Sequence, residues 1–399
     1  MMPFACTILA AAAAMALPQR GQAAPFVPQS GAEVLETLPR RDNAADAALR
    51  RERARLAAAP RDPALAAEAA RRYIELGRAS SDPRYFGYAQ AVLAPWWSAA
   101  TPPVPVLLMR ATLLQSSHRF VEAIRDLDAV TRAEPGNAQA WLTLATVQVV
   151  RGEFGAAVRS CGRLSSLAGQ LASTTCLANA RAASGQLAAS ERLLALAFER
   201  SAPARAAQDA SQAGLKLWAL TLLGELAARR GDAALAEERF RQALALAPGD
   251  NYLLGAYADL LLDQGRQAEV QVLLRDHLHV DGLLLRHTIA AQVAPAKAIA
   301  IAELQARFDA ANRRGDAIHQ REQARFELQL RRNARLALKL ALANWQIQKE
   351  PADLRILLEA ALAANDPAAA RPALAWRRQH GLEDGIIASL ARKLGGGVI

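Results

Sequence analysis

Glycines recur along the middle of this 399-residue sequence at nearly constant distances. Gly152, Gly185, Gly231 and Gly265 are separated by steps of 33, 46 and 34 residues, and the longest step contains an insertion around residues 201–213. The small residues seven positions before these glycines are Ala145, Ala178, Gly224 and Ala258. Since a small residue lets two helices approach closely and a glycine favours a turn, this spacing indicates a repeated structural unit.

Apolar residues lie three and four positions apart on both sides of each turn glycine, which predicts two antiparallel amphipathic helices per unit. Neither helix could bury its apolar stripe alone, but stacked pairs would bury a continuous core through contacts between neighbours. Runs of Val, Ile, Thr and Tyr that favour strands are scarce, and aromatic residues make up only 5% of the chain. The pattern therefore predicts an all-α fold.

The clearest unit covers residues 220–248. After its turn glycine it continues with Asp232, Ala236, Phe240, Ala243 and Pro248. This order of small residue, glycine, small residue, aromatic, alanine and closing proline resembles the tetratricopeptide repeat (TPR). Similarity to a group of exported bacterial TPR proteins lies in the stretches Leu93–Trp97, Ala138–Thr143 and Asn344–Trp345. The resemblance implies a right-handed α-solenoid of TPR-like antiparallel helix pairs.

The resemblance covers residues 44–394, and the repeats are clearest in residues 104–277. Residues 24–43 are rich in proline and are expected to form an extended leader, and the glycine-rich residues 395–399 are expected to form a flexible tail.

Two positions test the helix boundaries in the weaker units. Asp62 precedes Pro63, an order that predicts a helix cap followed by the first turn of a helix. His118 stands where other units have the turn glycine.

Residues 1–23 are typical of a signal peptide. Residues 8–17 form an apolar run rich in alanine, and cleavage is expected after Ala23 in the small-residue site of residues 21–23. No Lys or Arg precedes the apolar run, so a wrongly assigned start and an alanine-rich cytoplasmic tail stay open as alternatives. No later run of about 18 apolar residues predicts a transmembrane span. We therefore expect a periplasmic or secreted protein.

Cys161 and Cys176 lie nearly symmetrically about a turn near Ala168 and Gly169. That placement puts them at the same level on adjacent antiparallel helices, where a disulfide bond can form. In an oxidising compartment such a pair is more often bonded than free. The alternative is two small buried apolar residues.

Signatures of enzymes are missing from the sequence: it has no His-Glu-x-x-His, no Gly-x-Ser-x-Gly and no phosphate-binding glycine-rich loop. We therefore predict a protein that is not an enzyme and has no cofactor and no catalytic residues. Ligand-type residues cluster at Asp276, His277, His279, Asp281 and His287. Since His277 and His279 are two positions apart, they would point to different sides of a helix, so no metal site is expected.

The formal net charge of +10 arises mostly from arginines scattered among Asp and Glu. No dense basic stripe alternates with aromatic residues, so nucleic-acid binding is not predicted. The charge does fit an acidic protein or an anionic surface polymer as partner.

In TPR arrays the first helix of each pair lines a concave groove that holds a segment of a partner protein. By register, the resemblance implies that the groove contains Gln139, Thr146, Asn179, Trp218, Thr221, Glu225, Tyr252, Asp259, Arg321, Arg325 and Arg355. Trp218 and Tyr252 are the preferred anchors, because exposed aromatic residues concentrate binding energy. Packing of both rings against the neighbouring repeat is an equally open alternative.

The function implied by the resemblance is an exported scaffold or adaptor that binds a partner protein or peptide. The alternative is an accessory factor for cell-envelope assembly or polysaccharide export. A hydrolase that carries repeats is disfavoured by the missing catalytic signatures.

Overall fold

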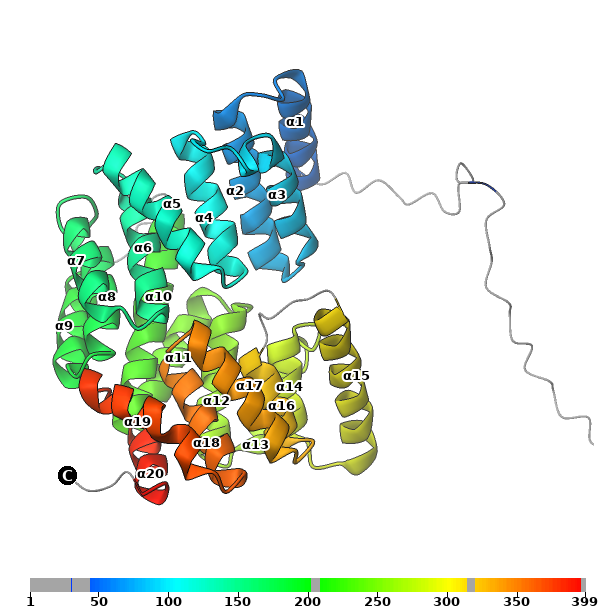
Figure 1. Ribbon diagram of the computed structural model, residues 1–399, viewed down its shortest axis with the longest axis vertical. Helices are drawn as coiled ribbons and strands as arrows, with labels where there is room; N and C mark the ends of the chain where they lie inside the picture. The colour runs from blue at the N-terminus through cyan, green and yellow to red at the C-terminus, as the bar shows by residue number, and fades with distance from the viewer. Residues whose placement is uncertain (1–29, 31–43, 202–208, 314–319, 396–399) are drawn as a thin grey trace, which may run out of the picture. The chain divides into compact units, whose positions relative to one another are not determined.

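A computed structural model of the chain describes residue 30 and residues 44–201, 209–313 and 320–395. These residues form helices α1 to α20 and contain no strand, so the all-α prediction is confirmed. The chain divides into two compact units, Met1–Arg51 and Glu52–Ile399, with the division inside α1 (Ala44–Ala58). Helices α2 to α20 belong to the second unit. Figure 1 labels the helices along the chain.

Antiparallel helix pairs follow one another through the second unit, as expected for a TPR-like solenoid. The first helices are α2 (Pro63–Ser80), α4 (Val104–Ser116), α6 (Ala138–Val150), α8 (Gln170–Ala182), α10 (Asp209–Arg230), α12 (Asn251–Asp263), α14 (Asp281–Ala290), α16 (Gln320–Gln329) and α18 (Pro351–Ala363). The second helices are α3 (Arg84–Trp97), α5 (Phe120–Ala133), α7 (Phe154–Leu164), α9 (Leu187–Arg200), α11 (Ala233–Leu246), α13 (Gln267–Leu274), α15 (Ala294–Arg313), α17 (Ala334–Ile347) and α19 (Pro367–His380). After them comes α20 (Gly385–Lys393).

The turn glycines adopt the backbone conformation that makes glycine necessary. The four glycines of the repeat have positive φ angles between 71° and 89°. A Cβ atom is disfavoured in this left-handed region, so glycine ends the first helix at the lowest steric cost. His118 has φ 56°, which confirms that it replaces the glycine at the same place. The carboxylate of Asp62 caps α2 by accepting hydrogen bonds from Ala64 N and Leu65 N, as predicted.

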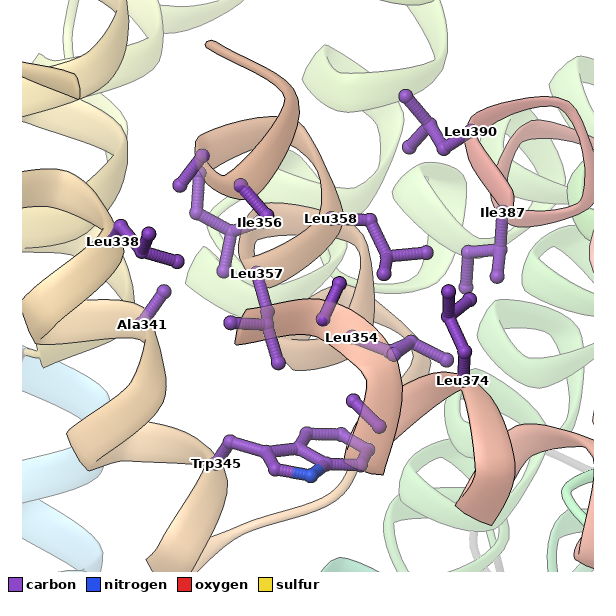
Figure 2. Packing of buried hydrophobic residues seen from close by; sticks show 14 of the residues in the cluster. Leu338, Ala341, Trp345, Leu354, Ile356, Leu357, Leu358, Leu374, Ile387 and Leu390 are labelled. Atoms are coloured by element: carbon purple, nitrogen blue, oxygen red, sulfur yellow. The ribbon is translucent and has the colours of Figure 1, made fainter. Parts of the chain in front are cut away.

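The core is continuous from one pair to the next. In its C-terminal part, Leu338 and Trp345 of α17 pack with Leu357 of α18, Leu374 of α19 and Ile387 of α20 (Figure 2). All five side chains are buried. Because each helix contributes only one stripe of this core, removing a pair would expose the stripes of its neighbours.

The last pairs also contact pairs from the middle of the chain, which the prediction of contacts between neighbours alone did not include. Lys349 N donates a hydrogen bond to the carbonyl oxygen of Val150, the last residue of α6, at 2.7 Å. The ring of Trp376 in α19 lies 5.7 Å from that of Phe154 in α7. Leu187 N, at the start of α9, donates to Glu383 Oε2 at 2.8 Å. These contacts join turns and helix ends that no local sequence period relates to one another.

Gly224 offers a direct test of the packing between α10 and α11. A Cβ atom added there would lie 2.5 Å from Cε1 of the buried Phe240 ring. We predict that Gly224→Ala lowers the free energy of unfolding by about 1–3 kcal/mol, because the ring must move in a filled core. Urea unfolding followed by circular dichroism measures the change.

The matched control is Gly214→Ala in the same helix, where an added Cβ meets no atom within 4 Å. There alanine should stabilise the helix by up to about 1 kcal/mol. A neutral effect at both positions would contradict the close approach of the two helices.

Candidate functional site

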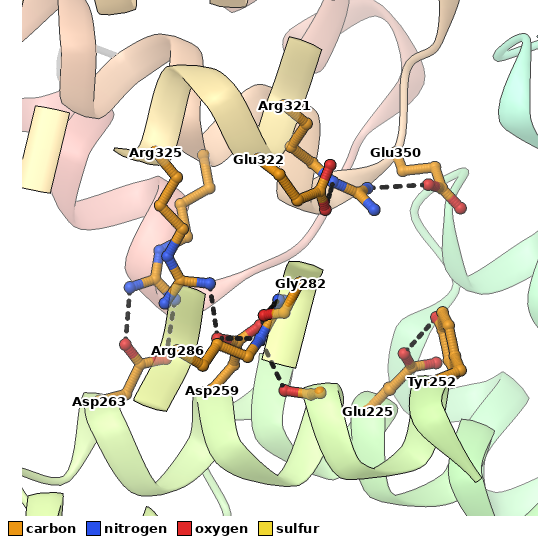
Figure 3. Close-up of polar contacts among 12 residues, drawn as sticks. Glu225, Tyr252, Asp259, Asp263, Gly282, Arg286, Arg321, Glu322, Arg325 and Glu350 are labelled. Atoms are coloured by element: carbon orange, nitrogen blue, oxygen red, sulfur yellow. Dashed lines mark hydrogen bonds and ion pairs between the residues drawn. The ribbon is translucent and has the colours of Figure 1, made fainter. Parts of the chain in front are cut away.

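Polar side chains from the first helices α10, α12, α14, α16 and α18 point toward one another (Figure 3). At their centre, Asp259 of α12 accepts hydrogen bonds from Arg286 of α14 and Arg325 of α16, each with a shortest N–O distance of 2.6 Å. Burial by itself would raise the pKa of Asp259, but the two guanidinium groups outweigh it and hold the pKa below its usual value. Asp259 is therefore a charged link between three first helices.

A second ion pair joins α12 to α18. The guanidinium of Arg355 forms two parallel hydrogen bonds with the carboxylate of Asp263, at 2.6 and 2.7 Å. Arg355 Nε also donates to Glu359 Oε1 at 2.8 Å within α18. Two-pronged pairs of this kind hold both partners in a fixed geometry, so α12 and α18 are tied together although they are not consecutive first helices.

These ion pairs border a cavity of about 80 Å³. It is lined by Asp259, Arg286, Arg321, Glu322, Arg325, Gln329, Ala352, Arg355, Ile356 and Glu359. This volume is well below the roughly 300–1,000 Å³ of cavities that hold a ligand. A peptide segment would enter only if α12 separated from α16 and α18.

Glu225 and Tyr252 form the neighbouring part of this surface. Tyr252 Oη donates to Glu225 Oε1 at 2.6 Å, and the Tyr252 side chain is 63% exposed. Burial raises the pKa of Glu225 to about 7, although the hydrogen bond from Tyr252 acts in the opposite direction. The negative charge of Glu225 in turn raises the pKa of Tyr252. The pair presents a hydroxyl and an exposed ring on the first-helix layer.

Arg321 connects α16 to the start of α18. Its Nη1 lies 3.1 Å from Glu350 Oε2 and 3.4 Å from Asp353 Oδ1. Asp353 is fully buried and also accepts hydrogen bonds from Asn344 Nδ2 and from Glu350 N, at 2.8 and 2.9 Å. Burial raises the pKa of Asp353, while Arg321 lowers it. The first turn of α18 is thus fixed by buried polar contacts.

The structure brings together six of the residues predicted to line the groove: Glu225, Tyr252, Asp259, Arg321, Arg325 and Arg355. The other five lie outside this cluster. Hydrogen bonds within their own helices engage Gln139, Thr146 and Thr221, while Asn179 and Trp218 are partly buried on α8 and α10. Contact of any of these residues with a partner stays a prediction.

Arg286 and Asp263 were missed by reasoning from the sequence. Asp263 lies four positions after Asp259 and therefore on the same face of α12. This spacing was visible in the sequence and could have added Asp263 to the predicted groove. Its partner Arg355 is 92 residues away, and no repeat period predicts that contact.

Trp218 packs against the core cluster that contains Cys161 and Cys176. This favours the alternative in which its ring stabilises the neighbouring pair. The two cysteines are buried on α7 and α8 at the distance of a disulfide bond, with their Cα atoms 5.5 Å apart. The disulfide itself stays a prediction.

Among the described residues, no group of three or more His, Cys, Asp or Glu side chains is placed to hold a metal ion. In the sequence cluster considered for metal binding, Asp281 instead pairs with Arg307 at 2.7 Å. None of the helices in the described part of the chain combines the length and the apolar character that a membrane span requires.

Thiol titration tests the cysteine pair. In denaturant without reductant, the mature chain should show no reactive thiol, and reduction should release two. Replacing both Cys161 and Cys176 with Ala should lower the free energy of unfolding by about 3 kcal/mol, because the bond closes a loop of roughly 15 residues in the unfolded chain. Two thiols that react before reduction would rule out the bond.

The raised pKa of Glu225 predicts that the stability of the chain depends on pH. Its pKa is about 7 in the folded chain and about 4.5 when exposed, so the folded state binds more protons than the unfolded state between these values. The free energy of unfolding should therefore fall as the pH rises from 4.5 to 7.

Glu225→Gln should remove this part of the fall and be more stable than the unchanged chain at pH 8, by roughly 1–3 kcal/mol. Urea unfolding at pH 5, 6, 7 and 8 measures both chains. If the free energy of unfolding changes with pH equally in both chains, Glu225 does not titrate in this range.

Comparisons with known proteins give structural similarity only. No family model and no curated protein matches the chain. A tetratricopeptide repeat protein from Parabacteroides merdae is 12% identical, with 73% of this chain and 99% of that chain covered and a TM-score of 0.37. For Cut9–Hcn1, an APC/C hetero-tetramer, the identity is 12%, the coverage 77% of this chain and 52% of that chain, and the TM-score 0.37. For yeast Tom70 the identity is 11%, the coverage 88% of this chain and 91% of that chain, and the TM-score 0.32. The fold rests on the chain's own helix pairs and not on these likenesses.

Proposed function

We propose that this chain is an exported scaffold that holds a partner protein on its layer of first helices. The observation that carries the proposal is Tyr252, a large aromatic side chain that is 63% exposed on that layer and fixed by its hydrogen bond to Glu225. An exposed ring held in one orientation loses little conformational entropy on binding and buries a large apolar area. This is the property expected of an anchor in a protein interface.

The ion pairs of Asp259 and Asp263 support a binding position beside Tyr252. They tie α12 to α14, α16 and α18 and leave a cavity too small for a peptide. Opening this region would break charge pairs that are partly removed from water. A partner segment therefore contacts the layer beside Tyr252 rather than between the arginines.

Export is the second part of the proposal. It is supported by the apolar segment before Ala23 and by two cysteines placed for a disulfide bond. Such bonds persist in oxidising compartments such as the bacterial periplasm. The partner is accordingly an envelope or extracellular protein.

Crosslinking at position 252 tests the proposal. A photoreactive benzoylphenylalanine at Tyr252 should form a discrete adduct with one protein when the full chain is illuminated in intact cells. The matched control carries the same residue at Leu196, a half-exposed position on the second helix α9. Adducts at both positions, or at neither, would contradict binding beside Tyr252. A glycan adduct at Tyr252 alone would favour the polysaccharide-export alternative.

A further inference from the structure

The second helices of the last two pairs carry positive charges and no carboxylate. Helix α17 contains Arg335 and Lys339, helix α19 contains Arg371, Arg377 and Arg378, and neither contains Asp or Glu. The first helices of the same region are different, because their arginines pair with carboxylates in and around the cavity. Positive charge is thus left unbalanced on one layer of the C-terminal pairs.

Four of these cations form what we call the cationic face: Arg335, Lys339, Arg371 and Arg378. All four residues are exposed, and no hydrogen bond or ion pair joins their side chains to any residue that the structure describes. Arg335 and Lys339 are four positions apart, and Arg371 and Arg378 are seven apart. Both spacings place the two side chains on the same side of a helix.

The two helices present these side chains away from the core. Leu338 and Trp345 of α17 and Leu374 of α19 point into the C-terminal core (Figure 2). The rings of Trp345 and Trp376 lie 5.0 Å apart and join α17 directly to α19. The two helices that carry the cations are therefore joined by a direct contact.

Arg335 and Lys339 repel each other, because like charges four positions apart on a helix are unfavourable, and a nearby carboxylate would offset that repulsion. Neither helix supplies one. Surfaces of one sign instead attract and orient partners of the opposite sign.

We propose that the cationic face docks an acidic segment of a partner protein. Charge complementarity supports this occupant, since arginine forks match carboxylates in pairs of parallel hydrogen bonds. Neither α17 nor α19 exposes a large apolar side chain, so an anchor for insertion into a lipid surface is missing from these two helices. Trp345 is buried and Trp376 packs against the core, so these two helices offer a base no exposed ring to stack on. The inference goes beyond the proposed function, because it concerns second helices and does not involve Tyr252.

Fluorescence anisotropy of the full chain tests the proposal with a labelled 20-residue poly-glutamate peptide as probe. The test variant is Arg335→Gln, Lys339→Gln, Arg371→Gln and Arg378→Gln. It should bind the peptide at least about tenfold more weakly than the unchanged chain, and raising the salt concentration should reduce this difference. A variant with only the two α17 substitutions, or only the two α19 substitutions, should lose an intermediate part of the affinity for the peptide.

The matched control replaces four exposed arginines of α5 and α9 with Gln: Arg125, Arg132, Arg192 and Arg200. Its net charge equals that of the test variant. If only total charge mattered, both variants would bind the peptide equally weakly, and that result would overturn the proposal. Thermal unfolding of each variant confirms that it folds; if the fourfold variant does not fold, the two half variants decide.

A 20-base-pair DNA duplex and phosphatidylglycerol vesicles are measured in parallel. If the unchanged chain binds either the DNA or the vesicles more tightly than the peptide, and the test variant loses that binding, the choice of an acidic protein segment is overturned. Loss of peptide binding with unchanged crosslinking at Tyr252 would separate this surface from the one in the proposed function.

Discussion

A single helix pair from this chain would leave much of its apolar surface in water, because each pair buries its stripe against the next pair. The requirement that stripes face one another fixes where the turns fall, and hence why glycine or a residue with positive φ recurs at the end of first helices. It also fixes which side chains remain outside the core. The polar cluster on the first helices and the cationic face on the second helices are both consequences of this one packing constraint.

The sequence predicts the pairs well because their signals are local. Turn glycines, the Asp62 cap and the small residue opposite Phe240 each depend on positions within one unit. The same register assigns Tyr252 to a first helix, and its side chain is exposed on α12. Trp218, in an equivalent layer, packs against the cluster around the cysteines, because its neighbours come from preceding pairs that the local pattern does not specify.

Contacts between distant pairs were beyond prediction for a related reason. The link between Asp263 and Arg355 depends on how far each pair rotates relative to the previous one, and small rotations accumulate over several pairs. The same holds for Lys349 and Val150. A period read from the sequence gives the repeat unit but not this accumulated rotation, so partners on α12 and α18 could not be matched in advance.

Arginine has two roles in this chain, and they differ in the surroundings of its charge. Arg286, Arg325 and Arg355 form ion pairs with carboxylates of the same chain and thereby join first helices to one another. Arg371 and Arg378 have no such partner among the described residues. Total charge is therefore a poor guide to how the protein attracts a partner, since most of its effect depends on which cations are already neutralised.

The hydrogen bond between Leu187 and Glu383 and the packing of Trp376 on Phe154 also have a mechanical consequence. An array held only by contacts between neighbours extends gradually under tension, because each interface yields separately. Here a pull on the C-terminal helices meets attachments to α7 and α9 first, so extension must begin with their rupture. Resistance to stretching would then depend on a few tethers between residues far apart in the sequence.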